Sequence, residues 1–147
     1  MNADLLTNPM LLKRLYDEQL RPVTQRCGLT RVELDILLFL ANNPSYDTAR
    51  DIVHVRMLSK SQVSASLDAL AARGMLRAYH SADNRKVAHL TLLPPSADAV
   101  EQGRRAQQRF QEVLRQGIAP EELRRVERTV AQMTENIRAY LGEGERK

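Results

Sequence analysis

Three helix-start signals follow one another in the middle of this chain, and they constrain its fold more than any other feature. Residues 30–33 (Thr-Arg-Val-Glu) and 59–62 (Ser-Lys-Ser-Gln) have the spacing of a capping box, in which two residues satisfy each other's backbone N–H groups. Residues 48–51 give a weaker signal of the same kind. Asn-Asn-Pro at 42–44 and Gly74 stop the first and third segments. The sequence therefore predicts three short helices with tight connections.

Each of these helices has an apolar side that we expect to face one core. Apolar residues make up these sides. They are Leu34, Leu37, Leu38 and Ala41 in the first helix, Ile52, Val53 and Val55 in the second, and Val63, Leu67 and Leu70 in the third.

The period of the sequence changes after Gly74. Residues 75–80 are short and extended, residues 81–85 have turn composition, and residues 86–92 alternate in the manner of a strand. Two strands joined by a polar loop form a β-hairpin. A hairpin directly after three short helices is the winged helix-turn-helix arrangement. The predicted fold class is therefore mainly α with a small β-hairpin wing.

A longer helix precedes this arrangement. Asn8-Pro9 is a favourable helix start, and Gly28 ends the segment. Pro22 lies inside it and predicts a kink or a break near Arg21. One apolar stripe follows the helical spacing, with members Leu12, Leu15, Tyr16, Leu20, Val23 and Cys27.

A second long helical pattern begins at Ser96, is interrupted near Gly117 and restarts around Pro120. Its last part carries a stripe narrow enough for a helix–helix seam: Leu123, Val126, Val130, Met133, Ile137 and Tyr140. These flanking faces are larger than so small a domain can bury alone, and pairing two chains would cover them. We expect residues 1–28 and 96–147 to form a helical dimerisation region around a winged helix-turn-helix DNA-binding domain at 29–95.

Composition limits the classes of protein that this chain can belong to. Hydrophobic residues make up 43% but aromatic residues only 4%, which favours Leu- and Ala-rich helices over a sandwich or barrel. The single cysteine excludes an internal disulfide, and we see neither a signal peptide nor a membrane span, so a cytoplasmic location is expected. The net charge is +4, with most of the excess between Met57 and Leu92, carried by Lys60, Arg73, Arg77, Arg85 and Lys86.

The third short helix has a slim outer side opposite its apolar side. Ser61, Gln62, Ser64, Ala65 and Asp68 form that side, and a helix that enters the major groove needs small, hydrogen-bonding side chains near its N-terminus. The competing interpretation is a plain solvated face.

The hairpin tip, Asp83-Asn84-Arg85-Lys86, places two adjacent cations beside that helix. Such a tip can reach the DNA backbone or the minor groove, and Asp83 could orient Arg85. The alternative is an ordinary polar turn.

These residues resemble the MarR family, the multiple-antibiotic-resistance type regulators. The resemblance rests on Leu29-Thr30, on the 59–74 helix with Leu70 and Gly74, and above all on the wing pattern Asp83-x-Arg85-x-x-x-x-Leu90-Thr91. It implies an obligate homodimer that binds a pseudo-palindromic operator, usually represses, and often releases DNA when a small amphipathic ligand enters a cleft. The DNA-binding positions are then Lys60, Ser61, Gln62, Ser64, Ala65, Asp83, Arg85 and Lys86.

The sequence departs from the family pattern at several points. Ala65 and Ala78 stand where relatives often carry Arg, Asn84 replaces the first Arg of the wing pair, and Pro94-Pro95 replaces a common Gly. These departures leave open a second interpretation, a winged helix that binds protein.

Two further hypotheses concern ligands and redox chemistry. Tyr16, Leu20 and Phe39 are candidates to line a ligand cleft, although such residues more often belong to a core. Cys27 is a candidate oxidant sensor, although its place at a helix C-terminus raises the pKa of a thiol.

Catalysis is not expected. His54, His80 and His89 lack metal-ligand spacing, and no catalytic motif is present in the sequence. We therefore expect neither an enzyme, a metal site nor a cofactor.

Overall fold

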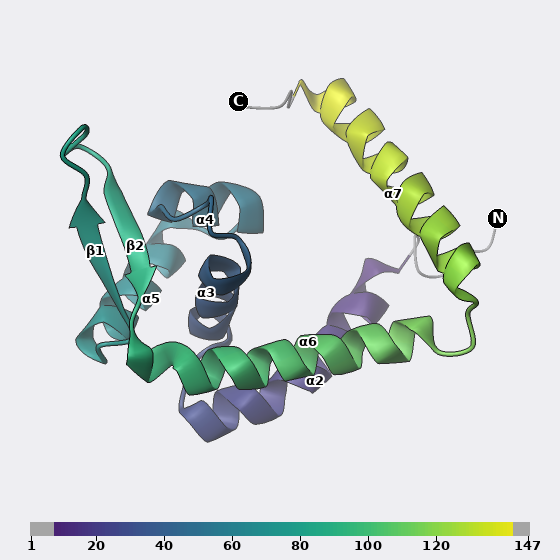
Figure 1. Ribbon diagram of the computed structural model, residues 1–147, viewed down its shortest axis with the longest axis horizontal. Helices are drawn as coiled ribbons and strands as arrows, with labels where there is room; N and C mark the ends of the chain where they lie inside the picture. The colour runs from purple at the N-terminus through teal and green to yellow at the C-terminus, as the bar shows by residue number, and fades with distance from the viewer. Residues whose placement is uncertain (1–7, 143–147) are drawn as a thin grey trace. The chain divides into compact units, whose positions relative to one another are not determined.

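The computed structural model describes residues 8–142, and the chain divides between Phe110 and Gln111 into two compact units. The parts of the expected dimerisation region at 1–7 and 143–147 lie outside the described residues. The elements are α2 (Pro9–Cys27), α3 (Arg31–Asn42), α4 (Ala49–Arg56), α5 (Lys60–Ala72), β1 (Leu76–His80), β2 (Ala88–Leu92), the short 3-10 helix η1 (Pro94–Ser96), α6 (Ala97–Arg115) and α7 (Pro120–Leu141) (Figure 1). Their order is the predicted one.

All three short helices begin with the predicted reciprocal caps. The Thr30, Thr48 and Ser59 hydroxyls accept the N–H of the third helical residue, whose side chain accepts the cap residue's N–H in return. Gly74 has φ +65° after α5, where the sequence predicted the stop. The prediction of three locally specified helices is confirmed.

Of the predicted kink or break near Arg21, the break is wrong, because α2 continues through Pro22. Proline removes the bond that its own N–H would donate to the Glu18 carbonyl, and its ring crowds that carbonyl. Leu20 and Val23 are buried on either side of it, and their packing holds the helix together. Asn8 occupies the cap position but makes no side-chain capping bond.

The two strands form an antiparallel hairpin in which Leu76 pairs with Leu92 and His80 with Ala88. Figure 1 shows the hairpin projecting away from the helices at one end of the first unit. The second strand starts at Ala88 rather than at the predicted residue 86, because Lys86 and Val87 still belong to the turn. The result is a wing anchored at its base and free at its tip.

The core of the first unit forms around α3, whose residues 36–40 are all buried. Ile52 enters it from α4, and Val63 and Leu70 enter from α5. Val55 does not, contrary to prediction: it is 49% exposed, because it lies in the last turn of a helix of 8 residues. Ser66 is buried on α5, where its small side chain lies among the apolar ones.

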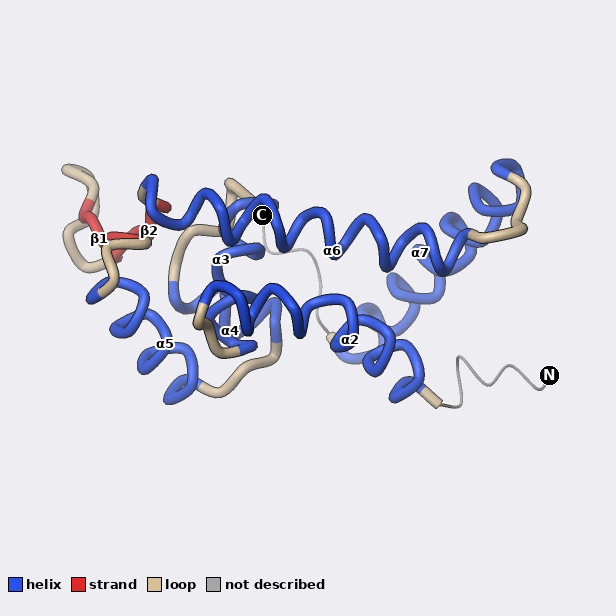
Figure 2. The backbone as a smooth tube through the Cα atoms, turned by 90° about the horizontal axis from the view of Figure 1, so that it is seen from below, coloured by secondary structure: helices blue, strands red, loops and turns tan. Residues whose placement is uncertain are grey.

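Helices α2 and α6 lie side by side, and α6 packs closely on α3 (Figure 2). Gly103 permits this approach, because a Cβ built on it would lie 2.7 Å from Leu38 Cδ2. No helix within residues 8–142 is long and apolar enough to cross a membrane.

In the second unit, α7 carries the predicted narrow stripe, and most of that stripe faces solvent. Val126, Val130, Met133 and Ile137 are between 43% and 59% exposed, and Tyr140 is 91% exposed. None of the residues that the structure describes in α7 is buried. An amphipathic helix of this length with an uncovered apolar stripe lacks the surface that it would pack against.

Candidate nucleic-acid interface

The outer side of α5 is exposed along its first two turns. Val63 and Leu70 anchor the opposite side in the core, while Leu67 is half-buried. The structure leaves five neighbouring candidates accessible together: Lys60, Ser61, Gln62, Ser64 and Ala65. Burial of Ser61 or Ser64 would have excluded this helix as a groove-reading element.

The Gln62 side chain can serve two functions, because its amide has an oxygen that accepts hydrogen bonds and an NH₂ group that donates them. Its Oε1 accepts the Ser59 hydroxyl at 3.0 Å and the Ser59 N–H at 3.4 Å, which completes the cap of α5. Its NH₂ group remains on the exposed side of the helix as a donor. The Ser59 and Ser61 hydroxyls are 3.2 Å apart, so the cap continues into the polar outer face.

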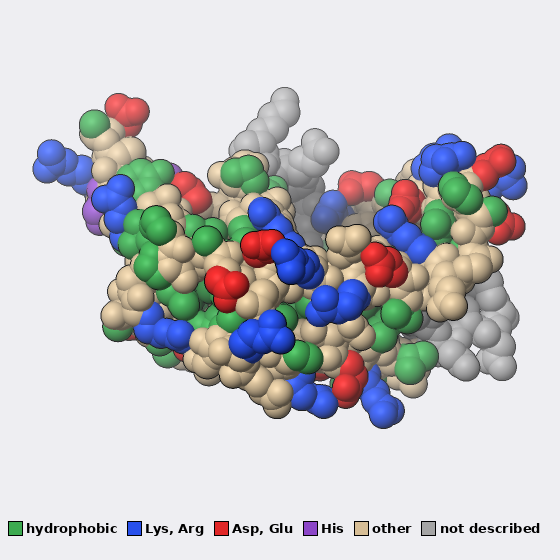
Figure 3. Space-filling view, turned by 60° about the horizontal axis from the view of Figure 1, so that its bottom comes forward, with side chains coloured by type: hydrophobic (Ala, Val, Ile, Leu, Met, Phe, Trp, Pro, Cys, Tyr) green, Lys and Arg blue, Asp and Glu red, His purple; other side chains and the backbone are tan. Residues whose placement is uncertain are grey.

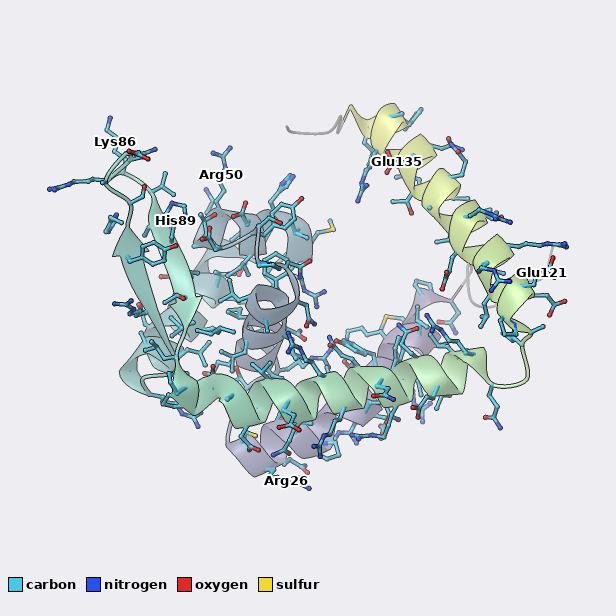
Figure 4. All side chains as sticks on the ribbon, in the orientation of Figure 1. Arg26, Arg50, Lys86, His89, Glu121 and Glu135 are labelled. Carbon is cyan, nitrogen blue, oxygen red and sulfur yellow. The ribbon has the colours of Figure 1, made fainter. Side chains whose placement is uncertain are left out.

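The wing tip presents Asp83, Arg85 and Lys86 to solvent. Asn84 shapes the turn, because its Oδ1 accepts the Lys86 N–H at 3.1 Å. No ion pair joins Asp83 to Arg85 in the described wing, so Asn84 rather than an Asp–Arg pair orders this tip. Figure 4 shows Lys86 at the far end of the hairpin.

A polar contact that the sequence did not reveal fixes the base of the wing. Asp47 Oδ1 lies 2.8 Å from His89 Nδ1, and the Asp47 carbonyl accepts the Leu90 N–H at 2.7 Å. The Tyr79 ring stacks on His89 with centroids 5.5 Å apart. These contacts join β2 to the loop before α4, so the wing and the three short helices are held together. We call this part of the chain, α3 to β2, the reading head.

The basic residues of the head divide into two groups. Arg73 is exposed, but its guanidinium already donates to the Gly28 and Cys27 carbonyls, at 2.8 and 2.9 Å. Arg77 is exposed, and so is Arg50, which sequence reasoning missed. Figure 4 shows Arg50 pointing toward the same edge of the molecule as Lys86. The sequence feature that could have revealed Arg50 is its position in the first turn of α4, where the helix dipole disfavours a positive charge.

This same segment of the chain is similar to a known protein family. Residues 28–86, from the end of α2 to the wing tip, match the sequence model of the MarR family. This stretch of the chain, from α3 to the wing tip, is therefore similar to the MarR family. No curated protein sequence matches the chain significantly.

Solved structures of MarR-family regulators share the fold across nearly the whole chain. A MarR-family transcriptional regulator from Silicibacter pomeroyi has a TM-score of 0.74 at 23% identity, covering 88% of this chain and 89% of its own. A MarR-family transcriptional regulator from Listeria monocytogenes, complexed with 26mer DNA, has a TM-score of 0.78 at 14% identity and covers 100% and 99%. A MarR protein from Peptoclostridium difficile has a TM-score of 0.77 at 15% identity, covering 97% and 93%. At these identities the likeness shows a shared fold.

Beside the winged helix, Cys27 lies half-buried at the end of α2. Burial raises the pKa of the Cys27 thiol, and the nearby Asp98 carboxylate raises it further, against the opposing effect of Arg26 and Arg73. A raised pKa lowers the thiolate fraction, and the thiolate is the form that reacts with oxidants. The structure therefore gives no support to the oxidant-sensor hypothesis.

The three candidate ligand residues occupy different environments. Leu20 and Phe39 are core residues, whereas Tyr16 is half-buried and accepts a hydrogen bond from Gln107 at 2.9 Å. A shallow hollow is present elsewhere, between α2 and α6, lined by Pro22, Val23, Arg26, Gln102, Arg105 and Arg109. Figure 3 views the molecule from the side of these helices, and basic and acidic side chains are interleaved there. The ligand site at Tyr16, Leu20 and Phe39 stays a prediction.

Proposed function

We propose that this chain is a transcription regulator that binds duplex DNA with α5 and the wing. The observation that carries the proposal is the exposed outer side of α5, slim and polar, on a head whose wing tip bears Arg85 and Lys86. The MarR-family match covers α3 to the wing tip, and the Listeria regulator of the same fold was solved with DNA. Neither reactive chemistry nor a cofactor has a part in this function.

The proposed residues divide into two kinds of contact. Lys60, Arg85 and Lys86, together with Arg50, neutralise phosphates and set affinity. Ser61, Gln62 and Ser64 reach base edges and set sequence preference, while Ala65 suits contact with a thymine methyl group. Asp83 accepts hydrogen bonds at the tip and limits how closely a phosphate approaches there.

The proposed regulator acts as a homodimer on a pseudo-palindromic operator. The uncovered stripe of α7 supports the dimer, because a second copy of that stripe would bury both. Residues 1–28 and 96–147 form the proposed dimerisation region, and 29–95 the DNA-binding domain. The regulator is proposed to be a cytoplasmic repressor that a small amphipathic ligand releases from DNA.

Salt dependence tests the phosphate contacts. For the full-length chain on its selected operator, log Kd is measured against log salt for the wild type and Arg85→Ala. Each phosphate contact contributes about 0.9 to the slope, so losing one per protomer reduces the slope of a dimer by about 1.8. Arg26→Ala is the matched control, since Arg26 is an exposed arginine at the opposite edge of the unit (Figure 4) and should leave the slope unchanged. An unchanged Arg85→Ala slope would contradict the wing assignment.

Reselection of operators from a random duplex pool tests the base contacts. Ser64→Ala removes one exposed hydroxyl, and Gln62→Glu keeps the capping acceptor while replacing the amide donor with a carboxylate. Each variant should change the preferred base at one position per half-site, with discrimination altered about 5- to 150-fold. Identical selected sites for both variants and wild type would show that α5 does not read bases. No salt-sensitive duplex binding at all would favour the protein-binding interpretation.

Transcription from a promoter that overlaps the selected operator tests the sign of regulation. A repressor lowers transcript yield in a purified system as dimer is added, whereas an activator raises it.

A further inference from the structure

Arg31 is the point where the reading head is joined to α2. It is the first residue of α3, and only Gly28, Leu29 and Thr30 separate it from the end of α2. Gly28 has φ +61°, a conformation that glycine adopts easily. A connection this short turns the chain sharply, and side-chain contacts across the junction must hold the angle.

The Arg31 guanidinium contacts three partners at once. It donates from NH1 to Asp17 Oδ1 on α2 and from Nε to Asp35 Oδ1 on α3 at 3.0 Å. Its Cζ also lies 4.9 Å from the centre of the Tyr16 ring on α2. The planar, branched donor geometry of arginine allows this arrangement, which a lysine ammonium cannot reproduce.

The contacts of Arg31 continue into the other helices of the unit. Asp35 Oδ1 lies 3.8 Å from an NH group of Arg56, at the end of α4. Tyr16 accepts a hydrogen bond from Gln107 on α6 and meets the Phe110 ring edge-on, with centroids 5.0 Å apart. One network therefore connects α2 and α6 with α3 and α4.

The other end of α3 is held by the same network. Gln107 Oε1 accepts from Asn42 at 3.0 Å, and Arg104 donates to Asn42 Oδ1 at 3.0 Å and to the Ala41 carbonyl at 2.7 Å. Side-chain contacts thus connect both ends of α3 to α2 and α6.

The environment of Arg31 makes this junction stronger than a surface ion pair. Burial acts to lower the pKa of Arg31, but the carboxylates of Asp35 and Asp17 outweigh it and the pKa is raised. The Asp35 side chain is only 12% exposed. Partly buried pairs are screened by salt much less than exposed ones.

We infer that Arg31 is a positioning residue, which fixes the angle of the reading head on α2 and thereby the half-site spacing that a dimer recognises. This inference rests on the proposed function. α5 has 13 residues, which makes the head about 20 Å across. A rotation of about 10° at the junction then moves the far side of the head by about 3.5 Å, one base-pair step of the duplex. A dimer can therefore distinguish half-site spacings only if the junction keeps the rotation of the head below this angle.

The test compares the selected operator with versions whose half-sites are one base pair closer or farther apart. Wild type should prefer its own spacing. Arg31→Lys keeps the charge and loses the branched geometry, so its preference for that spacing should fall by about threefold or more. Base preference within each half-site should not change. Arg21→Lys is the matched control, since Arg21 forms an exposed pair within α2 and should keep the spacing preference of wild type.

A merely structural role for Arg31 predicts a different result, namely that all spacings weaken by the same factor, and that result would overturn the inference. Wild type that binds no duplex would instead refute the proposed function. The distance distribution between spin labels at Ala82→Cys of the two protomers, in a Cys27→Ser background, tests the junction without DNA. It should broaden in Arg31→Lys, and an unchanged width would overturn the inference.

A second variant covers the case in which Arg31→Lys does not fold. Asp17→Asn removes the negative charge that Arg31 and Lys13 contact on α2 and leaves the Asp35 contact in place. Its spacing preference and its label distances should change in the same direction. If they match those of wild type, the inference is overturned.

Discussion

Adding one methyl group at Gly103 should destabilise the protein, although alanine is the better helix former. Alanine in place of a mid-helix glycine favours folding by about 1 kcal/mol. The new Cβ would lie 2.7 Å from Leu38 Cδ2, 3.0 Å from Cδ1 and 3.1 Å from Cγ. Rotating the tip of Leu38 relieves the first two contacts but not the third, and Leu38 is only 2% exposed. Overpacking of this kind costs about 2 kcal/mol, so Gly103→Ala should lose about 1 kcal/mol overall.

Making Gly103→Ala in a Leu38→Ala background tests whether the contact with Leu38 causes the loss of stability. Leu38→Ala alone should cost about 2–5 kcal/mol, but it also removes the atoms that the new Cβ meets. In that background Gly103→Ala should stabilise by about 1 kcal/mol, because only the helix preference remains. The sign of one substitution thus reverses with its neighbour.

The assay is urea unfolding followed by helical circular dichroism, at one fixed protein concentration because the proposed dimer would make the midpoint depend on concentration. Thermal melts should agree, with Gly103→Ala lower by about 2–4 °C. If Gly103→Ala stabilises the wild type, or has the same effect in both backgrounds, the close approach of α6 to α3 does not limit this position.

Three further substitutions or treatments test local physics. Met57 has φ 53° and is 91% exposed, so Met57→Gly should raise the urea midpoint through relief of about 0.5 kcal/mol of strain, whereas Met57→Ala, which keeps a Cβ, should not. The Cys27 thiol, with its raised pKa, should react with iodoacetamide at pH 8 more slowly in the folded protein than in urea. Equal rates would show that burial does not protect it. The hydrogen bond from Lys13 lowers the pKa of Asp17 against the opposing effect of burial, and Arg31 lowers it further. The stabilisation from Asp17 is therefore present above its ordinary pKa of 3.8 and is lost as pH falls below it, so unfolding free energy measured against pH should fall less steeply for Asp17→Asn in acid.

The sequence predicted best the features that depend on neighbouring residues. The capping boxes at Thr30 and Ser59, the stop at Gly74 and the hairpin are all decided within a few positions, so local patterns suffice. Pro22 failed as a helix breaker because the burial of Leu20 outweighed one lost hydrogen bond, and burial is a property of the whole fold.

The candidate site shows the same division between local and long-range features. The exposed side of α5 follows from helical spacing and could be predicted. The roles of Arg73 and His89 could not, because Arg73 bonds to carbonyls at the end of α2 and His89 pairs with Asp47. A charge count treats Arg73 and Arg50 alike. Both are exposed, and only the structure shows that the guanidinium of Arg73 is bonded to backbone carbonyls.

Gln62 both caps α5 and, in the proposed function, reads bases, and this double use limits how the proposed DNA preference can diverge. A mutation here that discards the side-chain oxygen weakens the first turn of α5, so Glu is the replacement that keeps the helix start intact. Ser64 and Ala65 have no part in the cap and can vary without that penalty. New target sequences should therefore be acquired first through those two positions, with the glutamine held in place by the helix that it starts.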